Sequence, residues 1–127
     1  MNYFEILEIP EDPILNRKIL DQSYFQLQQK YHPDHFENIE KSTQINEAYR
    51  ILKDQVSRIG YYLDLKKIPP FIPDADFFEF ALECKESKNI DLIETNYNLF
   101  LSDCLGNLEQ KEYFAARINY TKMLYFR

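Results

Sequence analysis

Apolar positions in the first half of the chain recur every three or four residues, the spacing of one face of an α-helix. Two such stripes are Leu20, Tyr24, Leu27, Tyr31 and Ile45, Ala48, Tyr49, Leu52. We expect two helices with these inner faces, joined by a polar loop and therefore packed antiparallel. Asn16 is placed to cap the first of them. A short apolar stretch at residues 3–7 predicts one or two helical turns before the pair.

The second half reads as a separate helical unit behind a proline-rich break. An apolar segment at 56–65 continues as helix, and Pro69, Pro70 and Pro73 then exclude a helix interior. Asp74 or Asp76 caps a helix reaching about residue 87 or 88. A second helix is expected from about 90 to 105, ending at Gly106-Asn107, and a third from about 108 onward. No alternating strand pattern occurs, so the predicted fold is all-α.

Composition narrows the possible functions. The net charge of −6 disfavours binding to nucleic acid, and no apolar run has the roughly 20 residues that span a bilayer. Cys84 and Cys104 fall at apolar helical positions, outside any CxxC pair, and indicate buried thiols in a reducing compartment. The first residues lack the pattern of a signal or transit peptide. We therefore expect a cytoplasmic protein of bacterial type, with no membrane or nucleic-acid partner.

The candidate chemistry is concentrated in His32-Pro33-Asp34, between the two amphipathic helices. Pro33 disfavours a helical residue before it, so the first helix ends there. Three other interpretations stay open on local sequence alone. His32 is an ordinary loop residue; His32, Asp34 and His35 bind a divalent metal; or His32 and Asp34 form a catalytic pair with a serine or cysteine. The last two lack a defined further ligand or nucleophile.

The motif in this context resembles a J domain, and the HscB type of co-chaperone in particular. The resemblance rests on Tyr3-Phe4, on QQKYHPDHF at 28–36, on TQINEAYRIL at 43–52 and on RIGYYL at 58–63. A second helical unit after a proline-containing linker also matches that type. The resemblance implies a J domain at 1–66, a linker at 67–73 and a three-helix bundle at 74–127.

The same resemblance implies what the motif does. His32, Pro33 and Asp34, with Lys18 and Lys30 on the preceding helix, would bind a chaperone of the HscA/DnaK type and stimulate its ATPase. His35 stands where family members often carry lysine, and the preceding helix has few cations, which predicts weaker electrostatic steering than is typical. We expect neither a catalytic residue, nor a cofactor, nor a bound metal, and hence no enzyme.

Helix angles in the second unit separate two apolar sides. At about 100° per residue, Phe77, Phe80, Ala81 and Cys84 share the predicted core side. Phe78 and Leu82 lie on another side, flanked by Glu79, Glu83 and Glu86, as suits a protein-binding patch. The last helix shows two stripes also, namely Tyr113, Ala116, Tyr120, Met123, Leu124 and Phe114, Ile118, Tyr125. The alternative is that both helices are buried on both sides.

In the HscB type, the second unit binds the IscU-type scaffold protein of iron–sulfur cluster assembly. The resemblance assigns that role to Phe78, Leu82, Glu79, Glu83, Glu86 and Tyr125, with Glu79 at a position more often apolar. It also implies a last helix several turns longer than the sequence holds. The expected function is delivery of the scaffold to the chaperone. The alternative is a general J protein that recruits the chaperone to unfolded clients.

Overall fold

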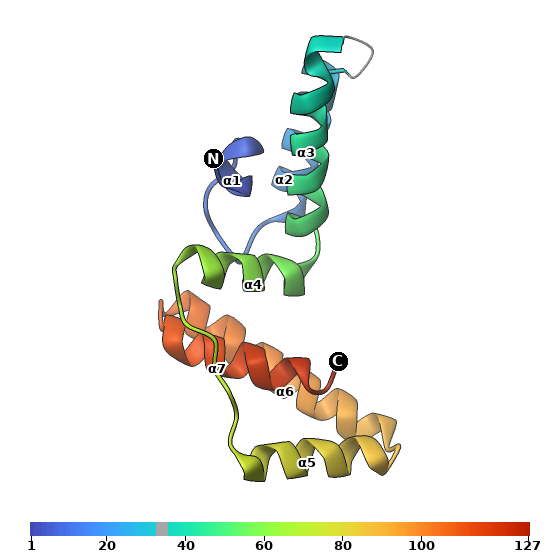
Figure 1. The fold of residues 1–127 in the computed structure, drawn as a ribbon, viewed down its shortest axis with the longest axis vertical. Helices are drawn as coiled ribbons and strands as arrows, with labels where there is room; N and C mark the ends of the chain where they lie inside the picture. The colour runs from blue at the N-terminus through green and yellow to red at the C-terminus, as the bar shows by residue number, and fades with distance from the viewer. Residues whose placement is uncertain (33–35) are drawn as a thin grey trace. The chain divides into compact units, whose positions relative to one another are not determined.

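The computed structural model describes residues 1–32 and 36–127. Within these ranges the protein has seven α-helices, one 3₁₀ turn and no strand (Figure 1), which confirms the all-α prediction. The helices are α1 (Tyr3–Ile6), α2 (Arg17–Lys30), α3 (Ile39–Leu52), α4 (Gln55–Leu65), α5 (Ala75–Glu86), α6 (Ile90–Glu109) and α7 (Tyr113–Leu124). They form two compact units, Met1–Tyr62 and Leu63–Arg127.

The first unit is built on the hairpin of α2 and α3, which lie side by side in Figure 1. The Asn16 side chain accepts a hydrogen bond from the Lys18 amide and so caps α2 as predicted. The core of the hairpin consists of Leu20, Leu27, Ile45, Ala48 and Leu52, all buried. The tyrosines of the two predicted stripes are only half-buried, because their hydroxyl groups need polar partners.

Helices α1 and α4 complete the first core. Phe4 is buried and meets the ring of Tyr62 edge-on, with ring centroids 6.4 Å apart. Arg58 is buried too, and its guanidinium donates to the carbonyls of Pro13 (2.9 Å) and Leu52 (2.7 Å). Burial lowers the pKa of Arg58. Arg58 thus fastens the segment before α2 and the end of α3 to α4, which gives the RIGYYL stretch a structural role.

The second unit contains α5, α6 and α7, with α6 and α7 in close contact. Ala81, Cys84 and Phe126 form one buried cluster of this unit, and the partly buried residues against that cluster are Phe77, Ile93, Tyr97, Phe100 and Tyr125. Phe80, predicted for the core side, is 42% exposed, although its ring contacts those of Phe77 and Phe126. Aromatic rings therefore make up most of this cluster.

The predicted helix ends around Gly106 are wrong. Helix α6 continues through Gly106 to Glu109, and the left-handed position that ends it is taken by Lys111, with φ of 58°. The buried side chain of Leu108 explains the extension, because leaving the helix at Gly106 would withdraw it from the core. Helix α7 accordingly starts at Tyr113 rather than near residue 108.

Candidate functional site

The predicted chaperone-binding motif follows the end of α2, and of its three residues only His32 lies within the described residues. Pro33 and Asp34, like His35, lie outside them. His32 is exposed, and its carbonyl accepts a long hydrogen bond of 3.5 Å from the Asn38 side chain. Tyr31, just before it, still donates its amide to Leu27 of α2. The approach to the motif is thus anchored in the hairpin.

Two lysines flank the tyrosine that precedes the motif. The ammonium groups of Lys30 and Lys41 lie 5.2 and 5.5 Å from the centre of the Tyr31 ring. Each contact is a cation–π interaction, which favours positive charge at this end of the hairpin. Lys30, one of the predicted chaperone-binding residues, thus lies over the ring of the residue before His32, and Lys41 of α3 adds a cation that the sequence pattern did not reveal.

Lys18 lies at the opposite end of α2, about 18 Å from Lys30 along the helix axis. It is exposed, whereas its neighbour Arg17 is engaged within the hairpin. Arg17 donates to Asp21 (2.9 Å) and to the Tyr49 hydroxyl (3.2 Å). The hydrogen bonds from Arg17 and then Tyr49 lower the pKa of Asp21. Because Asp21 neutralises Arg17, the positive charge that α2 offers to a partner comes from Lys18 and Lys30.

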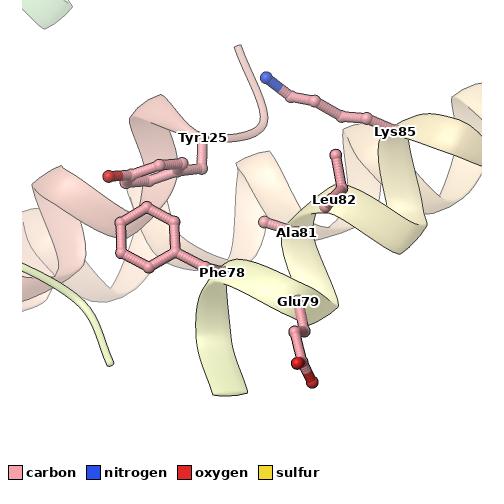
Figure 2. Close-up of a pocket in the computed structure, with 6 residues that line it drawn as sticks. All are labelled: Phe78, Glu79, Ala81, Leu82, Lys85 and Tyr125. Atoms are coloured by element: carbon pink, nitrogen blue, oxygen red, sulfur yellow. The ribbon is translucent and has the colours of Figure 1, made fainter. Parts of the chain in front are cut away.

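The predicted scaffold-binding residues include four that line one groove. Phe78, Leu82, Glu79 and Tyr125 surround a hollow of about 350 Å³ between α5 and the end of α7, together with Ala81 and Lys85 (Figure 2). The ring of Tyr125 meets that of Phe78 edge-on, with centroids 5.1 Å apart. Phe78 and Leu82 are 40% and 57% exposed, so they belong to a surface rather than to a second core.

Glu83 and Glu86 stand on the same helix but do not line the groove. Both are exposed and continue the flank that begins with Glu79. Lys85 is a residue of the groove that sequence reasoning missed. Its position was visible in the sequence, because a residue three beyond Leu82 and seven beyond Phe78 falls on the same side of a helix.

The other interpretations of the sequence rest on His32, Asp34 and His35, of which only His32 lies within the described residues. Among the described residues, no three or more His, Cys, Asp or Glu side chains are placed to hold a metal ion. Burial raises the pKa of the Cys104 thiol to about 12, so at neutral pH this thiol is protonated and a poor nucleophile. Within residues 1–32 and 36–127, none of the helices is both long and apolar enough to cross a membrane.

The hairpin and its motif match a known family. Residues 2–61 fit the model of the DnaJ domain. Over 124 residues the chain is 34% identical to the co-chaperone protein HscB of Buchnera aphidicola, covering 87% of this chain and 69% of that protein. It is 35% identical over 94 residues to the HscB homologue of Acinetobacter baumannii, covering 68% of this chain and 55% of that protein.

Solved structures extend the similarity to both units. The chaperone HscB from Vibrio cholerae superposes with a TM-score of 0.80 at 26% identity, over 99% of this chain and 91% of that one. The human co-chaperone protein HscB superposes with a TM-score of 0.84 at 24% identity, over 99% of this chain and 77% of that one. At that lower identity, the human likeness concerns the fold.

Proposed function

Because this chain belongs to the HscB family of J-domain co-chaperones, which work with an Hsp70-type chaperone in iron–sulfur cluster assembly, we propose that it stimulates the ATPase of an HscA/DnaK-type chaperone. The observation that carries the proposal is His32, exposed directly after α2 in a hairpin that the DnaJ model matches. The chain itself catalyses no reaction in this proposal.

In the proposed mechanism, His32, Pro33 and Asp34 bind the chaperone, and Lys18 and Lys30 orient the hairpin on it. Binding of this kind changes a partner's activity only if it favours one of the partner's conformations over another. The hairpin must therefore bind more tightly to the chaperone state that hydrolyses ATP. The anchored backbone at Tyr31 supports this role, because a fixed approach lowers the entropy lost on binding.

The test is the steady-state ATPase rate of the cognate chaperone with increasing co-chaperone. We expect the wild-type protein to stimulate hydrolysis and His32→Gln to lose at least about tenfold in stimulation, as expected when a central interface contact is removed. The double variant Phe78→Ala with Leu82→Ala serves as control and should stimulate like wild type. Equal stimulation by His32→Gln and wild type would contradict the proposal.

We further propose that the groove between α5 and α7 binds an IscU-type scaffold protein, through Phe78, Leu82 and Tyr125 with the carboxylates of Glu79, Glu83 and Glu86. Two observations support it. The apolar side chains of Phe78 and Leu82 on α5 are exposed, and the ring of Phe78 contacts the ring of Tyr125 across the groove. The three carboxylates lie along one side of these apolar residues, so the surface has an apolar centre and a polar rim.

Binding of the purified scaffold, measured by calorimetry, tests this second part. Phe78→Ala with Leu82→Ala should weaken binding by about a hundredfold, because two apolar anchors are removed. The matched control is Leu99→Ala with Phe114→Ala, which removes a leucine and a phenylalanine that are also exposed but lie outside the groove. Equal losses in the two pairs would count against the groove. Binding of an unfolded model client but not of the scaffold would favour the general J protein instead.

The functional boundaries that we propose are a J domain at 1–66, a linker at 67–73 and a scaffold-binding bundle at 74–127. The division of the chain into compact units inside α4 supports a boundary in this region.

We propose the bacterial cytoplasm as the compartment of this protein. Free buried thiols at Cys84 and Cys104 suit a reducing environment, and several similar proteins are bacterial.

A further inference from the structure

Lys85 occupies a position in the groove that neither the motif nor the proposed scaffold patch uses. Together with Phe78 and Leu82 it forms a single row on α5, since the three are spaced by four and three residues. All three line the groove, and in Figure 2 Lys85 lies at the end away from Phe78, with Leu82 between them. An apolar row that ends in a cation is therefore part of this surface.

The charges around the groove are divided between its end and its flank. Glu79, Glu83 and Glu86 follow one edge of α5, and Figure 2 shows the Glu79 carboxylate directed away from the apolar side chains. Within the part of the chain that the structure describes, no ion pair joins Lys85 to any of these three carboxylates. The positive and negative charges therefore remain available to a partner.

We infer that Lys85 is a specificity-determining residue, which selects a partner segment that carries a carboxylate next to an apolar side chain. This inference rests on the proposed scaffold site and adds the chemistry of its occupant. The apolar side chain enters between Phe78, Leu82 and Tyr125, and the carboxylate of the segment pairs with the Lys85 ammonium. Basic groups of the same segment face the glutamate flank.

Charge complementarity is what distinguishes this occupant from an arbitrary apolar or basic segment. The whole chain carries a net charge of −6, so at long range it attracts basic partners. A cation at the end of the groove repels a basic group at that one place and attracts an acidic one. Such a local reversal of sign fixes the direction in which a charged segment binds.

The alternative role for Lys85 is purely structural, with its methylene stem covering the apolar floor near Leu82. Lysine stems commonly do this while the ammonium stays in water. The two roles differ in what they require of the side chain. The variant Lys85→Met keeps an apolar stem and therefore preserves a covering role. It removes the charge, so it abolishes selection of a carboxylate.

The experiment measures the dissociation constant of the IscU-type scaffold encoded in the same genome, by calorimetry over a series of salt concentrations. We expect Lys85→Glu to weaken binding about tenfold and Lys85→Met about threefold, and both to change the salt dependence of binding. Lys88→Glu is the matched control, because Lys88 is exposed, lies three residues further on, does not line the groove and gives the same change in net charge. The dissociation constant of the Lys88→Glu variant should stay within about twofold of the wild-type value.

The outcomes separate the two levels of the argument. If Lys85→Glu binds as tightly as wild type or more tightly, or if Lys88→Glu loses as much, the role of Lys85 is overturned and the scaffold site stands. If Lys85→Glu binds the scaffold more weakly but Lys85→Met binds it as tightly as wild type, selection by attraction is overturned as well. If wild type shows no scaffold binding, the proposed function of the groove falls, and the inference falls with it.

Discussion

Arg117 illustrates, at the scale of single residues, how a charged side chain is kept inside the second unit. Its guanidinium donates to the Asp64 carboxylate at 2.6 Å and to the Ile68 carbonyl at 3.0 Å. The Arg117 side chain is 10% exposed, whereas that of Asp64 is 75% exposed. The buried partner in this pair is thus the arginine, and its hydrogen bonds fix the chain leaving α4 against α7.

Replacing Arg117 by Met should lower the free energy of unfolding by about 2 kcal/mol, because two hydrogen bonds to a buried guanidinium are lost. Asp64→Asn should cost less, under about 1 kcal/mol, because the carboxylate is largely in water and the Ile68 contact remains. Urea denaturation of the full chain measures both. A larger loss for Asp64→Asn than for Arg117→Met would contradict this account.

Residue-scale reasoning from sequence identified most of the groove but not all of it. Phe78 and Leu82 were separable from the core by helix angle alone, because their side of α5 points away from Cys84, while Ala81 lies between the two sides. Tyr125 was assigned by resemblance, since its contact with Phe78 joins positions far apart in sequence. Lys85 was missed because charged residues on a helix are usually solvated and carry little information. Phe80 was placed too deep because several aromatic rings compete for one small core.

At the scale of elements, four of the described helices are followed by a residue other than glycine in the left-handed conformation. The non-glycine residues with positive φ among those described are Glu8, Lys67, Lys88 and Lys111. Each is the second residue after the end of a helix, at the place where glycine is most favourable. The chain has only two glycines, and Gly106 lies inside α6. Lysine and glutamate therefore take left-handed conformations at some cost.

Moving the glycine should stabilise the protein. Gly106→Ala removes backbone freedom at an exposed helical position where a Cβ meets nothing within 4 Å, and Lys111→Gly relieves the left-handed conformation. Each change should add roughly 0.5 to 1 kcal/mol to the free energy of unfolding, and the double variant about their sum. Chemical denaturation measures the free energy of unfolding of each variant. Destabilisation by Gly106→Ala would show that α6 does end near residue 106 in solution.

The elements themselves were largely predictable, and their boundaries less so. Leu20 and Leu27 on α2, and Ile45 and Leu52 on α3, are buried as the 3.6-residue periodicity predicted. The end of α6 was not predictable from local signals. Gly106-Asn107 is a good helix stop by itself, but burial of Leu108 outweighs it, and burial depends on partners outside the helix.

At the scale of the whole molecule, net charge and its placement determine how partners are attracted. The chain carries −6, and on α2 only Lys18 and Lys30 offer positive charge that is not already held by Asp21. In the proposed complex, long-range electrostatic attraction through the cations of α2 is therefore small, and binding would rely on short-range contacts around the motif. The motif's cations Lys30 and Lys41 are concentrated at Tyr31, where they act at close range.

Stimulation of the chaperone should consequently depend little on salt. Raising NaCl from about 50 to about 300 mM should increase the half-stimulating concentration less than about threefold, because few exposed cations are screened. The variant Gln22→Lys with Gln29→Lys, which adds charge to exposed positions of α2, should bind more tightly and become more sensitive to salt. A steep salt dependence of the unmodified chain would contradict the prediction.

The central claim is that one chain connects a chaperone and a scaffold through two separate surfaces. Its most direct test is the ATPase rate of the chaperone in the presence of scaffold and an equimolar mixture of His32→Gln and the double variant Phe78→Ala with Leu82→Ala. The account predicts that wild type stimulates synergistically with scaffold, and that the mixture does not, because neither variant carries both surfaces. Synergy restored by the mixture would contradict the account.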